Sequence, residues 1–488
     1  MSYLNYILDG YIWLLRNNFW INMLFAILLI FFQRKNPTST WLWFMVIIFL
    51  PGFGFILYLF LGQDMSKSRI FEHKEEEDRI FKNLVFNQGK AIEKDKYKFL
   101  NPRAEEYEDL INMHIQTSEA YFSEDNKIEL YFSGEEKFKA LLDSISKAKE
   151  YIYLEYYIVR SDDIGRKLID KLTEKAKEGL DVRFLYDAMG GRKLARNYFD
   201  GFKKAGGKVA VFFPALIPYL SIRINYRNHR KICIIDGKEA FVGGFNIGDE
   251  YLGLKKKFGF WRDTHIKIEG TAVKGLLWSF MRDWRFASKD RDFNLKFDFG
   301  SKEGSGKAGV QIVTSGPDSK WSSIKDGYFN MITKAKERIY IQTPYFIPDD
   351  SMYDALKVAG LSGKDVRVMI PCKPDHPFIY WAGLSYIGEL LEAGVRFYTY
   401  ENGFLHSKVL IMDDFVTSVG TANLDIRSFK LNFEVNAFIY DEEINRKMVQ
   451  QFYKDLEYCK EITKEVYANR SNIVKIKESF SRLLSPIL

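Results

Sequence analysis

The chain has few cysteines, and they are poorly placed for bonding to one another. Three cysteines occur among 488 residues, at positions 233, 372 and 459, and no two have C-x-x-C spacing. This excludes a disulfide framework and a thiolate zinc site, and it favours a reducing compartment. Apolar residues make up 47% of the sequence and charged residues 28%, a balance that excludes a disordered chain.

Charge is scarce in the first 62 residues, whose only charged side chains are those of Asp9, Arg16, Arg34 and Lys35. The 21 residues from Trp41 to Leu61 carry no charge, and this is long enough for a transmembrane helix. A shorter apolar run, from Phe19 to Phe32, precedes them across a polar turn. The sequence predicts an N-terminal transmembrane helical hairpin over residues 1–62, with re-entrant insertion and a signal peptide as the alternatives.

Basic residues bear on the orientation of this hairpin. Arg34 and Lys35 lie in its turn, whereas Lys67, Arg69, Lys74 and Arg79 follow the second span. The count weakly favours a multi-pass protein of the cell membrane with a cytoplasmic catalytic part. The net charge of the whole chain is modest, +7 from 71 basic and 64 acidic side chains, and does not indicate a broad nucleic-acid track.

Strand-like and helix-like segments alternate from about residue 126 and predict an α/β fold. The expected strands are 128–132, 151–159 and 182–186, and the expected helices are 137–149 and 165–177. Residues 63–125, rich in both charge signs at 72–79, are expected to be a charged linker and lead-in.

The same order returns later in the chain. Ser146-Lys-Ala-Lys-Glu-Tyr-Ile-Tyr matches Thr333-Lys-Ala-Lys-Glu-Arg-Ile-Tyr at an offset of 187 residues. This predicts a duplicated domain, with a first copy at 126–297, a Gly/Ser/Lys-rich connection at 298–309 and a second copy with a C-terminal tail at 310–488. The end of that tail, from Ile473, reads either as a second surface anchor or as a frayed helix.

Each copy contains one unusual motif, H-x-K-x4-D-x6-G-x-x-N. Its members are His229, Lys231, Asp236, Gly243 and Asn246 in the first copy, and His406, Lys408, Asp413, Gly420 and Asn423 in the second. By composition, one such string should arise by chance on the order of once in ten thousand chains of this length. Two copies are therefore a strong indication of function.

The spacing within the motif indicates phosphodiester chemistry. A strand places residues i and i+2 on one face, so each copy offers an imidazole and an ammonium to a shared site. The lysines can neutralise non-bridging oxygens, one histidine can attack phosphorus, and the other can protonate the leaving oxygen. This chemistry requires neither a metal nor another cofactor. Asp236 and Asp413 come at the end of an apolar strand, so they either act in the site or organise the following turn.

These motifs resemble the phospholipase D superfamily, whose hallmark is a duplicated His-Lys-Asp motif. The resemblance covers residues 126 to about 470 and implies two α/β domains with mixed sheets and a covalent phosphohistidine. It implies His229 as the nucleophile and His406 as the acid and base, although the sequence itself does not distinguish the two. The family uses a carboxylate to orient each imidazole, for which Asp263 and Glu434 are the candidates.

Further positions follow from the same resemblance. Glu155 and Gln342, equivalent at the offset of 187, are expected either to line the site or to be polar strand ends. The residue after the motif glycine, commonly serine in the family, is Gly244 in the first copy and Thr421 in the second. The first site therefore lacks this hydroxyl and must use backbone amides or Asn246.

The hairpin sequence, Asn246-Ile-Gly-Asp-Glu-Tyr251 and Gln342-Thr-Pro-Tyr-Phe346 resemble bacterial cardiolipin synthases. The resemblance implies transfer of a phosphatidyl group from one phosphatidylglycerol to another, giving cardiolipin and glycerol, at an anionic membrane surface. A hydrolytic phospholipase D, a membrane-tethered nuclease and an inactive scaffold are the alternatives. The sequence does not indicate the oligomeric state.

Overall fold

The computed structural model describes residues 37–50, 79–94, 96–214, 226–290 and 306–483, together with 20, 23–25, 27, 54–55, 57–58, 293 and 485. The chain divides into two compact units. One comprises residues 1–76 and 215–225, and the other residues 77–214 and 226–488. All residues of the predicted site belong to the larger unit.

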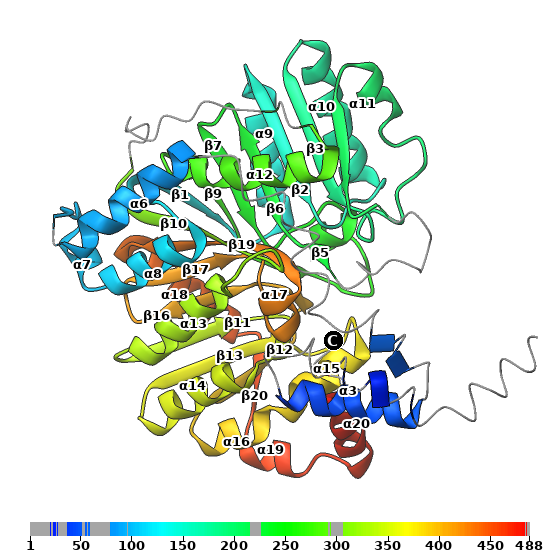
Figure 1. Cartoon of the computed structure of the whole chain (residues 1–488), viewed down its shortest axis with the longest axis vertical. Helices are drawn as coiled ribbons and strands as arrows, with labels where there is room; N and C mark the ends of the chain where they lie inside the picture. The colour runs from blue at the N-terminus through cyan, green and yellow to red at the C-terminus, as the bar shows by residue number, and fades with distance from the viewer. Residues whose placement is uncertain are drawn as a thin grey trace, which may run out of the picture. The chain divides into compact units, whose positions relative to one another are not determined.

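A 16-stranded mixed sheet forms the centre of the larger unit in the described residues (Figure 1). Its path is β20-β14-β13-β11-β16-β17-β19-β10-β1-β9-β7-β6-β2-β3-β4, with β5 paired to β19. The first-half strands are β1 (Phe122–Tyr131), β2 (Tyr151–Tyr156), β3 (Asp181–Asp187), β4 (Lys208–Phe212), β5 (Arg227–Asn228), β6 (Lys231–Ile235), β7 (Glu239–Gly243) and β9 (His265–Glu269). Those of the second half are β10 (Ala308–Ser315), β11 (Arg338–Gln342), β13 (Asp365–Pro371), β14 (Arg396–Tyr400), β16 (Val409–Met412), β17 (Val416–Gly420), β19 (Asn432–Tyr440) and β20 (Cys459–Ile462).

The sheet confirms the duplication as two α/β halves joined edge to edge. Each half places a parallel trio of strands, β2-β3-β4 or β11-β13-β14, beside an antiparallel set. The halves meet where β1 pairs antiparallel with β10, at Phe122 opposite Gln311. In Figure 1 the first-half strands occupy the upper part and the second-half strands the lower part. The two predicted domains thus share one continuous sheet, which the sequence did not reveal.

Equivalent helices cover the sheet in both halves. The first half has α9 (Gly134–Lys147), α10 (Asp163–Lys177), α11 (Asp200–Lys204), the 3-10 turn η2 (Asp249–Leu252) and α12 (Val273–Ser288). The second half has α13 (Ser323–Lys334), α14 (Asp350–Leu361), α15 (Pro377–Ser385), α16 (Ile387–Glu392), α17 (Ile426–Lys430), α18 (Glu442–Leu456), α19 (Lys464–Ala468) and α20 (Asn472–Leu483). The predicted strands and helices between residues 128 and 186 are all present, with ends shifted by up to six residues.

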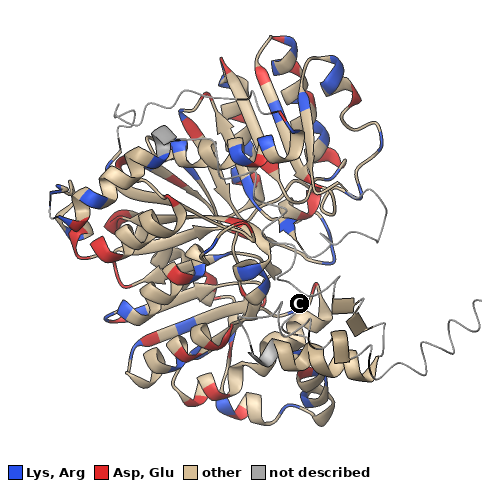
Figure 2. Cartoon of the chain, viewed as in Figure 1, with Lys and Arg blue, Asp and Glu red and all other residues tan. Residues whose placement is uncertain are grey.

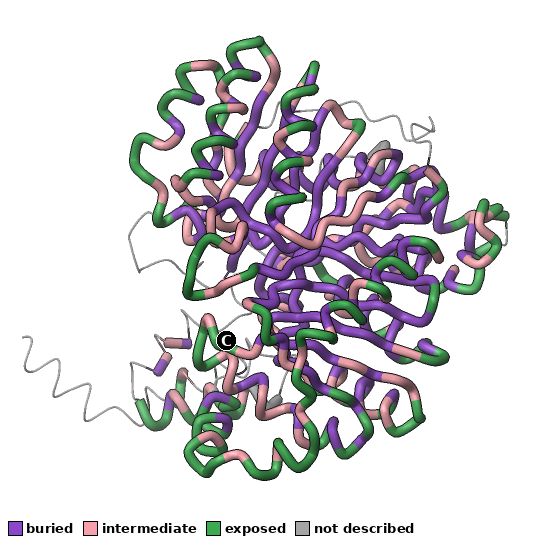
Figure 3. The backbone as a smooth tube through the Cα atoms, turned by 180° about the vertical axis from the view of Figure 1, so that it is seen from behind, coloured by how far each residue is buried: buried purple, intermediate pink, exposed green. Residues whose placement is uncertain are grey.

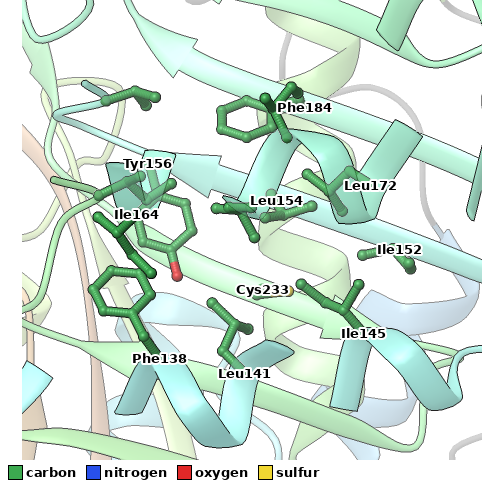
Figure 4. Close-up of a cluster of buried hydrophobic side chains, with 14 of the residues drawn as sticks. Phe138, Leu141, Ile145, Ile152, Leu154, Tyr156, Ile164, Leu172, Phe184 and Cys233 are labelled. Carbon is green, nitrogen blue, oxygen red and sulfur yellow. The ribbon is translucent and has the colours of Figure 1, made fainter. Parts of the chain in front are cut away.

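Strand periodicity divides the core of the first half into two layers. Ile152, Leu154 and Tyr156 of β2 point to one face, where they join α9 and α10 in a buried apolar cluster (Figure 4). Tyr153 points to the opposite face and stacks on Phe280 of α12, with ring centroids 5.1 Å apart. The central strands are buried along their length, whereas the helices expose their outer sides (Figure 3).

The charged segment before the first domain is more structured than its composition predicted. It contains α6 (Arg79–Glu93) and α7 (Pro102–Glu105), and α6 packs on α8 (Glu108–Ser118). The side-chain amide of Gln88 in α6 exchanges two hydrogen bonds of 2.8 and 2.9 Å with the backbone of Phe122, at the start of β1. The prediction of a solvated linker is therefore wrong for residues 79–93, which tie into the sheet.

The smaller unit contains α3 (Pro37–Phe49), which has no charged side chain (Figure 2). After it, Gly54 N donates to Leu50 O (2.6 Å). Ile47 and Tyr58 are buried in a small aromatic cluster with Trp43 and Phe55. Within the described part of the chain, no helix has the length and apolarity needed to cross a membrane. Most of the first predicted span lies outside the described residues, as does much of the second.

Candidate active site

The two motif histidines are each anchored to a strand of the opposite half. His229 follows β5, which pairs with β19, and its backbone N–H donates to Phe433 O (2.9 Å). His406 follows β15 (Phe404–Leu405), which pairs with β8 (Trp261–Arg262), and its N–H donates to Arg262 O (2.7 Å). These short crossed strands bring both motif copies to the junction between the halves.

The same crossing governs the imidazole rings. Nδ1 of His229 lies 3.0 Å from both carboxylate oxygens of Glu434, in the second half. Nδ1 of His406 lies 2.7 Å from Oδ2 of Asp263, in the first half. The predicted carboxylates therefore contact the histidines, and each one orients the imidazole of the other copy.

Both carboxylates are fully buried and remain ionised. Burial alone would raise the pKa of Glu434, but the charge and hydrogen bond of His229 outweigh it and lower that pKa. Burial likewise opposes the ionisation of Asp263, and Lys408 and His406 reverse its effect, so the pKa of Asp263 is also lowered. An ionised carboxylate can only accept, so Nδ1–H donates in each pair and Nε2 is left for the substrate.

Burial and neighbouring cations lower the pKa values of the two imidazoles and the two ammonium groups. Burial first, and the nearby lysines second, lower the pKa of both His229 and His406 to about 4, despite the attraction of their carboxylates. Burial also lowers the pKa of Lys231 to about 7 and that of Lys408 to about 8. A bound phosphodiester would bring the negative charge that favours the protonated form of both ammonium groups and of the histidine that acts as the acid.

Each motif lysine folds back on its own histidine. Lys231 Nζ donates to His229 O at 2.6 Å, and Lys408 Nζ donates to His406 O. These bonds fix the two ammonium groups beside the imidazoles, as the i, i+2 spacing predicted, and leave further N–H donors on each ammonium for phosphate oxygens.

An aromatic ring lies against each histidine, and sequence reasoning missed both rings. Tyr157 meets His229 edge-on with centroids 4.9 Å apart, and Trp261 lies 5.1 Å from His406. Their signal was positional, because Tyr157 follows Glu155 by two residues and Trp261 precedes Asp263 by two. These rings shield the imidazoles and contribute to their desolvation.

The structure does not bring the motif aspartates to the histidines. Asp236 accepts the backbone N–H groups of residues 149, 150 and 151 at 2.8–3.0 Å, and Asp413 accepts those of residues 336, 337 and 338 at 2.8–2.9 Å. Each aspartate lies beyond its strand, seven residues after the histidine, which is about 23 Å at 3.3 Å per residue. Asp236 and Asp413 hold the loops before β2 and β11, which corrects their expected place in the reaction centre.

The motif asparagines also serve local structure. Asn246 accepts from Ile158 N at 3.0 Å and donates to Tyr251 Oη at 3.2 Å. Asn423 donates from Nδ2 to Asp425 at 3.1 Å, and its Oδ1 has no hydrogen-bond partner among the described residues. Neither forms a hydrogen bond with a histidine, so they shape the loops behind the site.

The positions after the motif glycines differ for a steric reason. A Cβ at Gly244 would lie 1.9 Å from Oδ1 of Asp263, so only glycine leaves room for that carboxylate. Oδ1 of Asp263 accepts a hydrogen bond from the backbone N–H of Thr264 at 2.7 Å. At the equivalent place, the Thr421 hydroxyl donates to Val435 O at 3.2 Å and accepts from Val435 N at 2.9 Å, next to Glu434, whose pKa it helps to lower. In the first site the carboxylate thus accepts from a backbone amide, and Asn246 hydrogen-bonds Ile158 and Tyr251 instead.

Glu155 lies behind the first histidine and does not touch it. It accepts from Asn228 Nδ2 at 2.5 Å, one residue before His229. It also shares a hydrogen bond with Asp283 of α12, which forms an ion pair with Arg230. Burial and the charge of Asp283 raise the pKa of Glu155 well above its ordinary value, so this carboxyl group keeps its proton at pH values where a free glutamate has lost it.

Gln342 has the corresponding place in the second half. Its Nε2 donates to Asp455 of α18 at 2.7 Å, and Asp455 pairs with Arg262, the residue before Asp263. The amide of Gln342 thus donates to Asp455 at any pH. Glu155 can donate to Asp283 only while its carboxyl group is protonated. Both networks support the residues next to the histidine-carboxylate pairs, and neither reaches the imidazoles.

The described residues hold no cluster of three or more His, Cys, Asp or Glu side chains arranged to bind a metal ion. The catalytic groups that the structure does bring together are two imidazoles, two ammonium groups and two carboxylates. This set can stabilise a phosphodiester anion, attack it and transfer a proton to the leaving group.

Comparison with known families gives two matches. The family described as "Cardiolipin synthase, PLD-like domain" matches residues 141–269 and 328–456, one match in each half. The family described as "Phospholipase_D-nuclease N-terminal" matches residues 21–63. Together they cover both motif copies and most of the apolar N-terminal segment.

Curated relatives are similar over nearly the whole chain. The major cardiolipin synthase of Bacillus subtilis is 50% identical, with 96% of this chain and 98% of that protein covered. Cardiolipin synthases of Oceanobacillus iheyensis and Listeria monocytogenes are 48% and 47% identical, with at least 96% of this chain and 97% of each relative covered. The crystal structure of a Haemophilus influenzae phosphatidylserine synthase matches in fold with a TM-score of 0.59 at 17% identity, covering 78% of this chain and all of that one.

Proposed function

Since the chain belongs to the cardiolipin synthase family of phospholipase D-like proteins, we propose that it condenses two phosphatidylglycerol molecules into cardiolipin and glycerol through a phosphohistidine. The observation that carries this proposal is the pair of neutral imidazoles, each held at Nδ1 by a buried carboxylate of the opposite half. One imidazole forms the covalent bond to phosphorus, and the other moves the proton.

In the first step, Nε2 of His229 attacks the phosphorus of one phosphatidylglycerol. Before this step the bound phosphodiester anion favours the imidazolium form of His406, which carries a proton on Nε2 as well as on Nδ1. The bond from phosphorus to the headgroup glycerol oxygen breaks, and that oxygen takes the proton from Nε2 of His406. The products are free glycerol and a phosphatidyl group on His229. Lys231 and Lys408 stabilise the charge on the non-bridging oxygens, and Glu434 stabilises the positive charge that His229 acquires.

In the second step, His406 takes the proton from a headgroup hydroxyl of a second phosphatidylglycerol. The freed oxygen attacks phosphorus, and the bond to Nε2 of His229 breaks. Cardiolipin leaves, and both histidines return to their starting states, so atoms and protons balance over the cycle. At a bilayer surface, lipid hydroxyls are highly concentrated near the intermediate, which lets transfer compete with hydrolysis.

The same proposal includes a membrane location. The uncharged α3 and the N-terminal family match support a hairpin over residues 1–62 that inserts in the cell membrane as two spans. The larger unit then lies on the cytoplasmic side, next to anionic lipid that includes its substrate. Trp41 and Trp43 near the start of the second span suit the membrane interface.

The test is to incubate the purified full chain with phosphatidylglycerol alone in mixed micelles and to quantify all products. The proposal predicts glycerol and cardiolipin in equal amounts, with little phosphatidic acid. Phosphatidic acid as the main product would instead indicate a hydrolase. A parallel reaction with a chelator should proceed at the same rate, because lysines rather than a metal stabilise the charge.

A further inference from the structure

Helix α15 is apolar on every side and yet poorly buried. Its nine residues include no charged side chain, and only Ala382 and Gly383 are buried. Phe378 is 53% exposed, and Trp381 is partly exposed. A helix that is apolar all round normally lies inside a core or in contact with lipid. We therefore expect another apolar phase or surface to cover the exposed side chains of α15.

Helix α20 packs beside α15 (Figure 1). The apolar face of α20 is exposed. Ile473, Ile476, Phe480 and Leu483 have helical spacing that places them along one stripe, and they are 60–78% exposed. The buried residues of α20 are instead the polar Glu478 and Ser481. This orientation is the reverse of the one that an ordinary surface helix takes, in which the apolar stripe faces the core.

Cations border this apolar surface. Lys477 Nζ lies 5.1 Å from the ring centre of Trp381 in α15, and the Arg482 guanidinium lies 5.1 Å from that of Tyr386. Lys475 is also exposed on α20. The acidic residue of α20, Glu478, is neutralised by Arg470 at 2.8 Å. An exposed apolar stripe with cations on either side matches the interface of an anionic bilayer.

The surface is continuous with the second half of the active site. Asp375, two residues before α15, accepts a hydrogen bond of 2.5 Å from Tyr345. The Asp375 carboxylate is close enough to Lys408 to act on its charge. The apolar helix thus begins beside the residues that surround His406, where the headgroup of a membrane lipid must enter.

We propose that α15 and α20 form a membrane-docking surface that inserts its apolar stripe into the headgroup region of an anionic bilayer and presents bilayer lipid to the active site. The proposal rests on the proposed function in that the substrate is a lipid. It adds a second contact with the membrane, made by the larger unit and placed next to the catalytic groups.

The test uses the full chain reconstituted in phosphatidylcholine vesicles, with Ile473→Asp combined with Ile476→Asp. The matched control is Val358→Asp combined with Leu361→Asp on α14, because these side chains are also apolar, three residues apart and similarly exposed, at 58% and 68% against 66% and 67%. Cardiolipin formation is measured with phosphatidylglycerol in the bilayer and, separately, with dihexanoyl phosphatidylglycerol added as monomers.

The docking variant should turn over bilayer substrate at least about tenfold more slowly and monomeric substrate within about twofold of wild type. The control variant should match wild type with both substrates. An unchanged rate on bilayer substrate overturns the proposal. An equal loss with both substrates overturns it too, because the surface then supports the fold or another part of the chain. If the docking variant and wild type differed in oligomeric mass by light scattering, the surface would be assigned to a second copy of the chain, and the proposal would be overturned.

A second readout does not depend on turnover. Vesicles containing a phosphatidylglycerol with a diazirine near its acyl carbonyl are irradiated, and labelled peptides are mapped by mass spectrometry. Label is expected in residues 377–385 and 472–483 and not in α14. Absence of label there overturns the docking surface even if cardiolipin forms, whereas label without cardiolipin would contradict only the proposed function.

Discussion

The two halves of the larger unit contain the same motif, yet neither half contains a complete site. The first half provides His229, but the carboxylate that orients its ring is Glu434 of the second half. The second half provides His406, and Asp263 of the first half orients that ring. Each imidazole therefore depends on a carboxylate of the other copy. Neither half can work alone, so the functional unit is the pair of halves.

The halves also differ where their chemistry should be equal. The first copy combines a short carboxylate, Asp263, with glycine at position 244, and the second combines the longer Glu434 with Thr421. Behind the histidines, a protonated Glu155 occupies the place that Gln342 has in the second half. These differences allow the two half-sites to be separated by experiment.

The largest expected effect comes from removing either histidine. His229→Ala and His406→Ala should each lower cardiolipin synthesis by about 10⁴-fold or more. A phosphatidyl ester of p-nitrophenol needs no acid for its leaving group, so with this substrate His406→Ala should still release a burst of p-nitrophenol. His229→Ala should release none, and the reverse pattern would exchange the two roles.

Replacing each orienting carboxylate by its neutral amide should give the same difference between the two half-sites, with a smaller loss of rate. Glu434→Gln and Asp263→Asn should each lower the steady-state rate by about 10²- to 10⁴-fold, because the imidazole loses its counter-charge. With the p-nitrophenol ester, Glu434→Gln should slow the burst, since it acts on His229, and Asp263→Asn should not. Stopped-flow absorbance measures both. A slow burst in Asp263→Asn alone would refute the crossed assignment.

Steric exchange at the motif glycine is a smaller perturbation. Gly244→Ser should displace the Asp263 carboxylate and lower the rate by about 10- to 100-fold, as expected for a catalytic group moved by a fraction of an ångström or more. Thr421→Ser, the control in the other half, keeps its hydroxyl and should stay within about threefold of wild type. Equal rates for the two variants would show that Asp263 tolerates a side chain at position 244.

The smallest effect concerns stability and depends on pH. Between about pH 4.3 and the raised pKa of Glu155, only the unfolded chain loses this proton, so the free energy of unfolding falls by about 1.4 kcal/mol per pH unit. Glu155→Gln removes that slope and should gain stability over wild type as the pH rises from 5 to 8. Gln342→Glu should introduce the same slope into the second half. Thermal unfolding across this range measures both, and parallel curves would contradict a protonated Glu155.

The sequence predicted the duplication and the histidine-lysine pairs, and its resemblance to the phospholipase D superfamily implied both orienting carboxylates. It could not predict the crossing, because the partners are 205 and 143 residues apart and equivalent in each copy. It also misjudged α6, although Val85 and Ile92 have helical spacing around the buried Gln88 and Gly89, because the charged residues before this helix dominated the interpretation of the segment. For Asp236 and Asp413, motif membership suggested catalysis, whereas their position after an apolar strand correctly indicated a turn.

The most direct test of the two-histidine account is to locate the covalent intermediate. The protein is mixed with phosphatidylglycerol labelled at phosphorus, quenched in alkali to preserve phosphohistidine, digested and mapped by mass spectrometry. The account predicts phosphatidyl on His229, with no label in His229→Ala. Label on His406, or turnover without any labelled histidine, would contradict it.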